Sequence, residues 1–537
     1  MTAHSRWAIW SRVVFLVAFG ILPALGALAQ AASLPDVNLS PEAGSQEIDS
    51  ATAASVDERC RGMQVGQIVV TGHNRTREQV VLQELLMSPG DPYDPELARE
   101  TERNLRALPF LGSASVVPRL DPETGSVRVQ ISVTERFPWV GGVLPTFGGG
   151  KLEVDVVGGT GNLLGRGQIL GARTFQSTEV QATYYLAFAE PRIAGSHWGA
   201  GFVVGTQGGV GPRNRVEVRR KLHSLSARWA FDASVFDEAS ERLFFENGST
   251  ISNYYERRRG IRASALRSFR KADRRLELGL RYTYRDDEHE QARDADGVIP
   301  LDKRRAVLMS HFTAERFEFV KDRYFDGMGP TEDLKLGLWG SVRAGGALEM
   351  LGSDRSYPKL GLSGGWFAGD PETGYIRLDG NVDTRIEAAN LTNLAAVATA
   401  RLYRRTGERG LLAWRAQFTL LHETEDPEQL LLDSPHALRG YPANAFDGEQ
   451  RLVFNLEWRR PLLSLGPITA GTVVFVDGGA IWSERETLGS SPFMIGLGTG
   501  LRMGLTNVIG APVVRLDLGY GARTKTWELS GGIGQRF

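Results

Sequence analysis

The sequence predicts a mainly β protein, a transmembrane antiparallel β-barrel preceded by one small α+β domain. Apolar and polar side chains alternate with a two-residue period over about 400 residues after Pro138. The segment before Pro138 has the pattern strand, helix, helix, strand, strand, and the chain starts with an export signal. The 537 residues include 63 glycines and one cysteine. Glycine at this frequency, without a collagen period, fits many strands joined by tight turns.

Residues 1–30 have the features of a signal peptide. Arg6 and Arg12 precede the apolar run VVFLVAFGILPALGAL, and the sequences ALA at 27–29 and AQA at 29–31 offer the small residues that a signal peptidase accepts. The apolar run has about the length of a signal core. We therefore expect export followed by cleavage, with a retained membrane anchor as the alternative.

Residues 31–61 are rich in Ala, Ser, Pro and acidic residues and have few large apolar side chains. Such a segment cannot offset its chain entropy by burial, so we expect a flexible linker. Cys60 lies at its end and follows Glu58 and Arg59 rather than an apolar lipid-attachment context. As the chain's single cysteine it cannot form an internal disulfide, and we interpret it as a thiol without a special role.

Residues 62–136 are predicted to form the α+β domain, with helices on one face of a sheet. Its first strand ends at Gly72. The first helix is expected to start with a capping pair, Thr76 and Gln79. The second is expected to start with Asp94 as N-cap and Pro95 in the first helical position. Two further strands are expected at about 113–120 and 126–135.

Residues 137–537 are predicted to form the barrel. In RLVFNLEWRRP, at 451–461, the apolar residues occupy the even positions. The same period recurs in RLELGLRYTYR and YIRLDGNVDTRIE, and such segments have about the 9 to 13 residues needed to cross a bilayer as tilted strands. A soluble sandwich or propeller also alternates, but its strands average about five or six residues. The polar face of the second segment mixes charges, as Arg377, Asp379, Asp383 and Arg385 show, and this favours a closed barrel interior.

The number of strands is predicted as 16 or 18. About 18 segments can be counted, and two of them can be read as halves of longer strands, with the boundaries least defined at 215–370. The last segment, TWELSGGIGQRF, places four residues on one face: Trp527, Leu529, Ile533 and Phe537. The aromatic Phe537 suits an anchor at the membrane-water boundary, and a final strand can be presented as an open edge to assembly machinery.

From about residue 62 to 537 the chain resembles the BamA-like outer-membrane superfamily, which includes the bacterial surface antigen family. Leu438-Arg439-Gly440-Tyr441 looks like the family's (Val/Ile)-Arg-Gly-(Phe/Tyr) loop motif. Phe475, Asp477 and Gly478, in FVDGG, are similar to its Phe-x-Asp motif. GNLLGRGQ at 161–168, AEPRIAG at 189–195 and Phe537 also agree with family habits. The resemblance implies that residues 62–136 are one polypeptide-transport-associated (POTRA) domain in the periplasm, and that the barrel has 16 strands in the outer membrane.

The two motifs are expected to meet inside the barrel. In ITAGTVVFVDGG, residues Ile468, Val474 and Val476 suit lipid, so Phe475 and Asp477 turn toward the interior. The resemblance implies that the loop folds inward and that Arg439 contacts the wall. An arginine away from bulk water needs a partner, and a guanidinium can meet a carboxylate with two hydrogen bonds. We therefore predict a salt bridge between Arg439 and Asp477, with a solvated arginine on an external loop as the alternative.

The sequence gives no sign of an enzyme, a cofactor or a metal site. The formal net charge of −1 lacks the basic footprint of a nucleic-acid binder. GLSGG at 361–365 fits the hydrolase pattern Gly-x-Ser-x-Gly, but it lies in an alternating segment with no helix after it. The acidic stretch DADG at 294–297 lacks the later glutamate of a calcium loop, and the histidines show no metal-ligand spacing.

Two functions remain open. In the first, the small domain captures unfolded periplasmic polypeptide by strand addition at a sheet edge, expected near residues 127–133, and the barrel inserts or exports it. The resemblance implies the same role. A two-partner secretion transporter fits less well, because those proteins usually carry two POTRA domains and a plugging helix. In the second, the barrel is a passive channel or a structural surface protein. The expected partners are unfolded polypeptide, outer-membrane lipid and the machinery that assembles the barrel itself.

Overall fold

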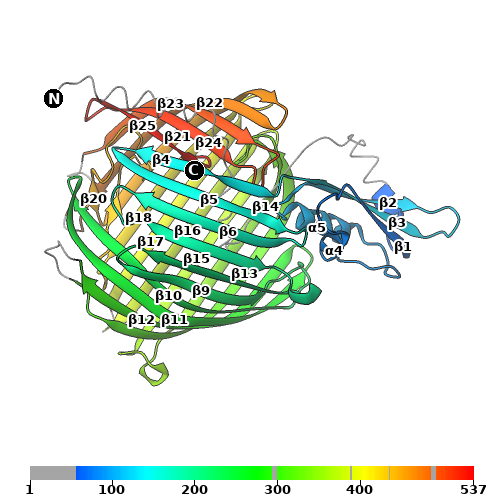
Figure 1. Cartoon of the computed structure of the whole chain (residues 1–537), viewed down its shortest axis with the longest axis horizontal. Helices are drawn as coiled ribbons and strands as arrows, with labels where there is room; N and C mark the ends of the chain where they lie inside the picture. The colour runs from blue at the N-terminus through cyan, green and yellow to red at the C-terminus, as the bar shows by residue number, and fades with distance from the viewer. Residues whose placement is uncertain (1–55, 293–298, 388–389, 435, 485, 487–491) are drawn as a thin grey trace.

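The computed structural model describes residues 56–292, 299–387, 390–434, 436–484, 486 and 492–537. The predicted signal peptide, most of the predicted linker and the acidic stretch 294–297 lie outside these residues. The described chain forms a small α+β domain beside a large closed barrel (Figure 1). Within the described ranges, no helix combines the length and apolar character needed to span a membrane.

The N-terminal domain has the predicted order of elements. These are β1 (Val65–Thr71), α4 (Glu78–Leu82), α5 (Pro95–Arg106), β2 (Leu111–Leu120) and β3 (Val127–Glu135). The sheet order is β1-β3-β2, with β3 parallel to β1 and antiparallel to β2. The edge expected at residues 127–133 is therefore wrong, because this segment belongs to the central strand and pairs on both sides. The free edges belong to β1 and β2.

The two helices start differently from each other. At α5 the Asp94 side chain accepts a hydrogen bond from the Glu96 backbone N–H at 2.8 Å, and Pro95 is the first helical residue, as predicted. At α4 the predicted cap is wrong, since the helix starts at Glu78 and its N-cap residue makes no side-chain bond. Thr76 donates its backbone N–H to Glu135 at 2.6 Å instead, and its hydroxyl accepts a hydrogen bond from Asn162 of the barrel. Tertiary contacts thus replace the local cap.

Cys60 is a core residue of the N-terminal domain. Its side chain is buried with Val81, Leu105 and Ile131, and Val56 packs against the same cluster. Burial raises the pKa of its thiol. The ordered domain therefore includes residues 56–61, which were predicted to belong to the flexible linker.

The barrel closes with 20 antiparallel strands among the described residues, so the predicted 16, and the alternative 18, are wrong. The strands are β4 (Trp139–Gly148), β5 (Lys151–Leu163), β6 (Gln168–Ser177), β7 (Thr183–Glu190), β8 (Trp198–Gln207), β9 (Gly211–Arg220), β10 (Trp229–Glu246), β11 (Ser249–Lys271), β12 (Arg274–Gln291), β13 (Lys303–Arg323), β14 (Thr331–Ala347), β15 (Tyr357–Asp370), β16 (Gly374–Glu387), β17 (Asn390–Arg405), β18 (Leu411–His422), β21 (Gln450–Leu465), β22 (Ile468–Trp482), β23 (Met494–Leu505), β24 (Val513–Gly521) and β25 (Thr526–Ile533). Counting failed because strand length varies from 8 residues in β7 to 23 in β11, so alternating segments have no common spacing. Short helical turns, η1 (Ile193–Gly195) and η2 (Glu349–Leu351), and a two-stranded sheet of β19 (Leu430–Leu431) and β20 (Asp447–Gly448) lie in the connections.

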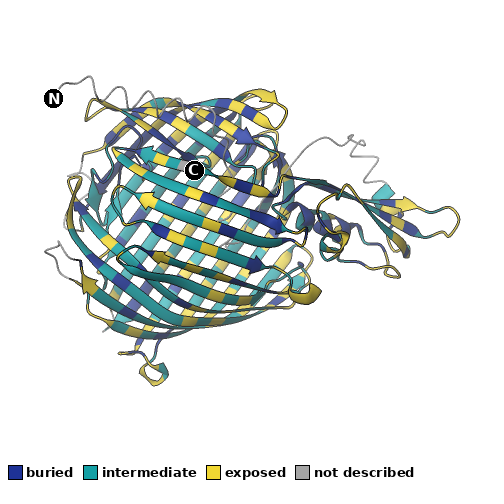
Figure 2. Cartoon of the chain, in the orientation of Figure 1, coloured by how far each residue is buried: buried dark blue, intermediate teal, exposed yellow. Residues whose placement is uncertain are grey.

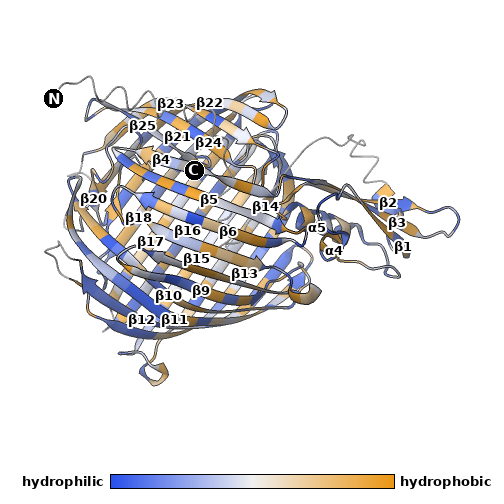
Figure 3. Ribbon diagram, in the orientation of Figure 1, coloured by the Kyte–Doolittle hydropathy of each residue, from blue (hydrophilic) through white to orange (hydrophobic). Residues whose placement is uncertain are grey.

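The two faces of the barrel wall differ as the alternation predicts. On β16, Ile376, Leu378 and Val382 are exposed on the outside. The alternate residues Arg377 and Asp379 point inward and form an ion pair with 2.9 Å between Nε and Oδ2. Figures 2 and 3 show this alternation along the strands, and the ends of β11 and β12 far from the N-terminal domain are hydrophilic. An apolar outer face around an interior of paired charges is the arrangement expected of a membrane barrel.

The N-terminal domain is docked on one end of the barrel, called the docking end below. Glu84 forms an ion pair with Arg192 after β7, and Arg106 of α5 forms one with Asp333 of β14, each at 2.7 Å. The Asn162 side chain, at the end of β5, donates a hydrogen bond to the Thr76 hydroxyl of the N-terminal domain. These contacts come from three separate parts of the barrel rim and fix the orientation of the domain.

Candidate functional site: the inward loop and the barrel seam

The connection between β18 and β21, residues 423–449, carries the predicted loop motif into the barrel. Leu438, Arg439 and Tyr441 have no exposed surface. Leu438 and Tyr441 pack with Val453 and Met494 of the wall in one hydrophobic cluster. The loop therefore folds inward and is not a solvated external loop.

Arg439 and Asp477 are in direct contact. The Arg439 Nε lies 2.7 Å from Asp477 Oδ2 and its Nη2 lies 2.8 Å from Oδ1, so the contact is bidentate. The Arg439 backbone N–H also donates to Asp477, at 3.1 Å. Below the guanidinium, its central carbon lies 3.4 Å from the centre of the Phe475 ring. The register places Asp477 and Phe475 on the inner face of β22, so the short spacing of the motif supplies both a carboxylate and an aromatic face.

Arg439 belongs to a larger buried network that the sequence interpretation missed. Its Nη1 donates to Glu457 at 2.6 Å and lies 3.6 Å from Asp517. Glu457 also pairs with Arg459 at 2.8 Å, and Asp517 pairs with Arg502 at 2.6 Å. These side chains are nearly or fully buried. In this part of the described barrel, carboxylates and guanidiniums share hydrogen bonds away from water, which satisfies charges that burial alone would penalise.

The alternation of polar and apolar residues indicated which side chains of β21 face the barrel interior, although it did not identify their partners in the Arg439 network. Asn455, Glu457 and Arg459 occupy the odd, polar positions of RLVFNLEWRRP. Their partners depend on the register between β21 and β22, which pairs Asn455 with Asp477. The Asn455 side chain now donates to Asp477 at 2.7 Å and to the Ala437 carbonyl at 2.8 Å. It ties the loop and the wall together. No single segment of sequence contains this information.

Glycines let the loop backbone lie directly on the wall. Gly440 has φ +92°, and a Cβ there would lie 2.7 Å from the backbone of Tyr520 and Gly521. A Cβ on Gly496 of β23 would lie 2.0 Å from the Arg439 carbonyl oxygen. The Tyr441 hydroxyl donates to the Ile495 carbonyl at 2.8 Å. Close backbone approach at a left-handed φ explains why glycine follows the arginine.

One residue of the predicted wall motif takes no part in the contact. A Cβ on Gly478 would meet the Phe493 ring at 3.0 Å, on the outer side of the strand. Phe493 is half exposed there. The motif's contact with the loop is thus made by Phe475 and Asp477 alone. Ser363, from the apparent hydrolase pattern, lies within β15, where no strand-to-helix turn exists.

Two of the four residues predicted to share a face of the last strand, Trp527 and Leu529, are exposed on the outer face of β25. Ile533 ends the strand and packs against the buried cluster of Val140, Val157 and Ile509. Phe537 is on the other side of the wall, which corrects the predicted common face. Gly534 turns the chain with φ +83°. The Phe537 ring then packs inside the barrel against the guanidinium of Arg459 at 5.0 Å, and its backbone oxygen accepts a hydrogen bond from the same residue at 2.7 Å.

The barrel is closed weakly at one place, the seam between β25 and β4. The two strands are joined at a single residue pair, Gly531 with Phe147. On its other side, β25 pairs with β24 continuously from Val514 to Gly521. Among the described barrel strands, β4 pairs along the rest of its length with β5 only. Most of the β4 edge therefore carries backbone groups that do not bond to the last strand.

Residues 63–136 match the family model described as POTRA, surface antigen variable number repeat. No curated protein matches the chain. The chain is similar to the solved structure of CdiB from Escherichia coli, with 12% identity, a TM-score of 0.46 and 99% of each chain covered. It is similar to CdiB from Acinetobacter baumannii, with 11% identity, a TM-score of 0.42, and 88% of this chain and 74% of that chain covered. It is also similar to BamA from Haemophilus ducreyi lacking POTRA domains 1-3, with 13% identity, a TM-score of 0.39, and 88% of this chain and 85% of that chain covered. TM-scores this low are compatible with many large barrels and carry no statement about function.

The N-terminal domain is therefore a POTRA domain. The predicted combination of such a domain with a closed antiparallel barrel is confirmed, and with it the predicted resemblance to the BamA-like superfamily in domain composition.

Proposed function

We propose that this chain, a POTRA domain followed by a closed barrel, is an outer-membrane protein that captures unfolded periplasmic polypeptide and passes it to the barrel for insertion or translocation. The apolar outer face of the wall meets lipid, and the POTRA domain lies in the periplasm. The process needs no enzymatic step and no cofactor. Its driving interactions are backbone hydrogen bonds, which accept varied sequences.

Capture is assigned to the free edges of the POTRA sheet. β2 and β1 each pair only with β3 among the described strands, so each has one row of backbone groups available to an added strand. Leu120, at the end of β2, is exposed, as is Gln67 on β1. An extended segment of substrate can continue the sheet at either edge.

The single observation that supports transfer to the barrel is the seam. One residue pair holds β25 to β4, so a substrate strand can replace it at small cost, while the unpaired edge of β4 offers a template for main-chain hydrogen bonding. On the other side of β25, the Arg439 network joins the loop to β21, β22 and β24 through Glu457, Asp477 and Asp517. The wall next to the seam is rigid, which confines opening to the seam itself.

The test combines a locked seam with crosslinking in cells. Phe147→Cys with Gly531→Cys, in a Cys60→Ala background, places a disulfide across the seam. Tyr520→Cys with Trp527→Cys places one across the neighbouring, fully paired strands as a matched control. A photoreactive residue is placed at Val117 on the β2 edge, at Gln130 on the central β3, or at Val143 on the β4 edge.

We expect polypeptide adducts from Val117 and Val143, and few from Gln130. The seam disulfide should abolish the Val143 adducts and keep the Val117 adducts, reduction should restore them, and the control disulfide should change neither. Absence of polypeptide adducts at Val117 would refute capture. If the yield of Val143 adducts is unchanged when the seam disulfide has formed completely, transfer through the seam is refuted and the alternative of a passive barrel is favoured.

A further inference from the structure

The hairpin of β13 and β14 extends beyond its neighbours at the docking end. β12 pairs with β13 only from Lys303 to Arg316, and β15 pairs with β14 only from Gly337 to Ala347. The hairpin itself continues to the pair Arg323 and Thr331. Its last part, residues 317–336, therefore pairs with no neighbouring strand of the described barrel and can change position without breaking the backbone ladder of the wall. We call this part the lid hairpin. Outside the ladder, Arg405 of β17 forms an ion pair with Asp322 and donates to the Arg323 carbonyl at 2.8 Å, so these contacts also hold the lid hairpin in place.

The lid hairpin bends inward at a glycine. Gly337, the first residue of β14 that pairs with β15, has φ +134°, and a Cβ there would lie 1.9 Å from the Arg316 carbonyl oxygen. Only glycine accommodates this backbone at such a short approach. The side chains change face at this point, since Leu336 is buried whereas Leu338, two residues later in β14, is exposed.

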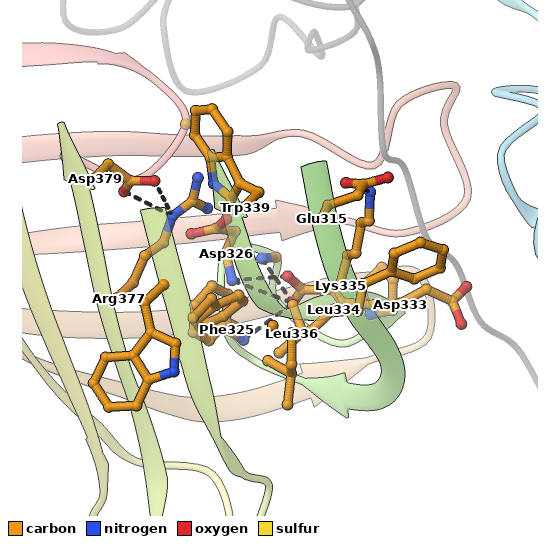
Figure 4. A pocket seen from close by; sticks show the side chains of 18 of the residues that line it. Glu315, Phe325, Asp326, Asp333, Leu334, Lys335, Leu336, Trp339, Arg377 and Asp379 are labelled. Atoms are coloured by element: carbon orange, nitrogen blue, oxygen red, sulfur yellow. Dashed lines mark hydrogen bonds and ion pairs between the residues drawn. The ribbon is translucent and has the colours of Figure 1, made fainter. Parts of the chain in front are cut away.

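One face of the lid hairpin covers the interior of the barrel. Phe325 contacts the rings of Phe367, Tyr375 and Tyr403, with centroid separations of 5.9, 5.4 and 4.4 Å. Leu334 and Leu336 are buried in the same cluster. Figure 4 shows Phe325 beside the strand that carries Arg377 and Asp379, while the Asp333 carboxylate points the opposite way. A cavity of about 600 Å³ lies beside the hairpin and is lined by Arg377, Asp379, Glu315 and Lys335.

The tip of the hairpin reaches across the barrel opening to β22 and β23. Met328 is buried, and a Cβ on Gly504 of β23 would lie 2.5 Å from the Met328 Cβ. A Cβ on Gly471 of β22 would lie 2.9 Å from its Cε. The two missing side chains leave a socket that the methionine fills. The Glu332 carboxylate shapes the tip, since it accepts backbone N–H bonds from residues 325, 326 and 327 at 2.9 to 3.2 Å.

The other face of the lid hairpin is held by helix α5 of the POTRA domain. Arg106 makes a bidentate ion pair with Asp333, with distances of 2.8 and 2.7 Å. The Arg103 guanidinium lies 4.3 Å from the centre of the Phe319 ring, and Lys321 donates to Glu102 at 3.2 Å. Arg106 is 4% exposed, so its pairing is shielded from solvent. Three residues on one face of α5 therefore hold the hairpin from outside.

We propose that the lid hairpin closes the docking end of the barrel and that helix α5 is its latch. Asp333, which binds the latch, is adjacent in sequence to Glu332, which shapes the tip, so a force on α5 acts directly on the segment that spans the opening. When the POTRA domain leaves its docked position, the Arg106–Asp333 pair breaks, the tip leaves the Gly504 socket and the barrel opens. The latch works in the same way whether the barrel transfers polypeptide or conducts solutes.

The test measures conductance of the purified full chain in planar bilayers, without any polypeptide. Asp333→Arg breaks the latch by placing two guanidiniums together, and Arg106→Asp combined with Asp333→Arg restores an ion pair with reversed polarity. Gly504→Leu fills the socket and leaves the latch residues unchanged. Glu408→Arg, in the exposed turn between β17 and β18 at the same end, is the control for charge reversal. Heat-modifiable migration on gels shows that each variant forms a folded barrel.

We expect the wild type and Glu408→Arg to be mostly closed. Asp333→Arg and Gly504→Leu should each raise the open fraction at least about tenfold, and the double reversal should return it to near the wild-type level. A wild type that is already fully open, or folded single variants with wild-type conductance, would overturn the lid. An open double reversal would overturn the latch. None of these outcomes depends on substrate capture, so failure of the lid and failure of the proposed function are distinguishable.

Discussion

Replacing Arg439 with alanine should destabilise the barrel strongly. Arg439 is fully buried, and its loss leaves Asp477 with only the Asn455 amide as a polar side-chain partner, while Glu457 keeps Arg459 and Asp517 keeps Arg502. Removing one partner of a buried ion pair typically costs about 3 to 5 kcal/mol. We expect a loss in that range in the free energy of unfolding, with the uncompensated Asp477 carboxylate as the main cause.

Double mutants show which carboxylate is responsible for the stability lost in Arg439→Ala. Because Asp477 is the group left without compensation, Asp477→Ala combined with Arg439→Ala should cost little more than Arg439→Ala alone, with a coupling of about 1 to 3 kcal/mol. Glu457→Ala combined with Arg439→Ala should cost clearly more, because Arg459 then loses its carboxylate partner, whereas Arg502 keeps Asp517. Arg439→Lys should recover only part of the loss, because an ammonium cannot match the bidentate geometry.

The assay is urea unfolding of the detergent-solubilised barrel, followed by tryptophan fluorescence and gel migration. Arg304→Ala is the matched control, since Arg304 pairs with Asp354 at 3.0 Å but is 61% exposed, and exposed pairs contribute less than about 1 kcal/mol. An Arg439→Ala cost no larger than that of Arg304→Ala would refute the structural role of the network. Strictly additive losses for Arg439 and Asp477 would refute their coupling.

Three further predictions concern single positions. Gly440→Ala should lower the free energy of unfolding by about 1 to 3 kcal/mol in the same assay, because it combines a left-handed φ with a clash against Tyr520. Gly466→Ala, at φ +57° with open space around it, is the control and should cost less. Equal costs for the two variants would contradict the close packing at Gly440. His197 and His223 stack at 3.5 Å beside Arg192 and Arg220, and burial, with the neighbouring charges, lowers the pKa of His223 from 6.5 to about 4 and also lowers that of His197. The unfolded state therefore binds protons that the docked state does not between pH 6.5 and about 4, so the interface loses stability as the pH falls through this window. Amide protection factors at the POTRA–barrel interface, which are corrected for the intrinsic pH dependence of exchange, should fall in the wild type and stay constant in His197→Gln/His223→Gln. Constant protection factors in the wild type would contradict the prediction. Asp94→Ala should cost about 1 kcal/mol of local stability, measured as faster amide exchange at the start of α5 in the full chain. Asp121→Ala, in the turn between β2 and β3, is the control and should leave amide exchange in α5 unchanged. Unchanged exchange in Asp94→Ala would show that packing alone fixes the start of the helix.

Local chemistry predicted the parts of this fold that depend on neighbouring residues. Alternation fixed which side chains face inward, so Asp477 and Phe475 were placed correctly, and Asp94 with Pro95 marked the start of α5. Each of these features depends on a few adjacent residues and on the period of one element. The inward position of Arg439 was implied by the family resemblance, and the need of a buried guanidinium for a carboxylate then predicted Asp477 as its partner.

The missed features depend on register and on contacts between distant segments. Asp517 joins the Arg439 network only because β24 follows β23 around the barrel, and β3 is central only because β1 pairs parallel to it. The turn YFDGMGP at 324–330 has the composition of an ordinary surface turn. Nothing local shows that Met328 reaches a socket formed by two glycines more than a hundred residues later in the chain.

The interactions inside the barrel differ around its circumference, and this difference limits where it can open. Between β21 and β24 the interior is filled by the inward loop and by buried ion pairs that span several strands, so separating these strands exposes charges with no alternative partner. At the seam, separation breaks one residue pair of the backbone ladder. Movement of the lid hairpin breaks the ring contacts of Phe325, the contacts with α5 and the Arg405–Asp322 ion pair, but leaves the ladder of the wall intact. Because the cost of opening follows the number of buried polar groups left unpaired, the rigid wall directs motion to the seam and the lid. Weakening the Arg439 network should therefore permit strand pairs other than β25 and β4 to separate, so that opening is no longer confined to the seam, before the barrel unfolds.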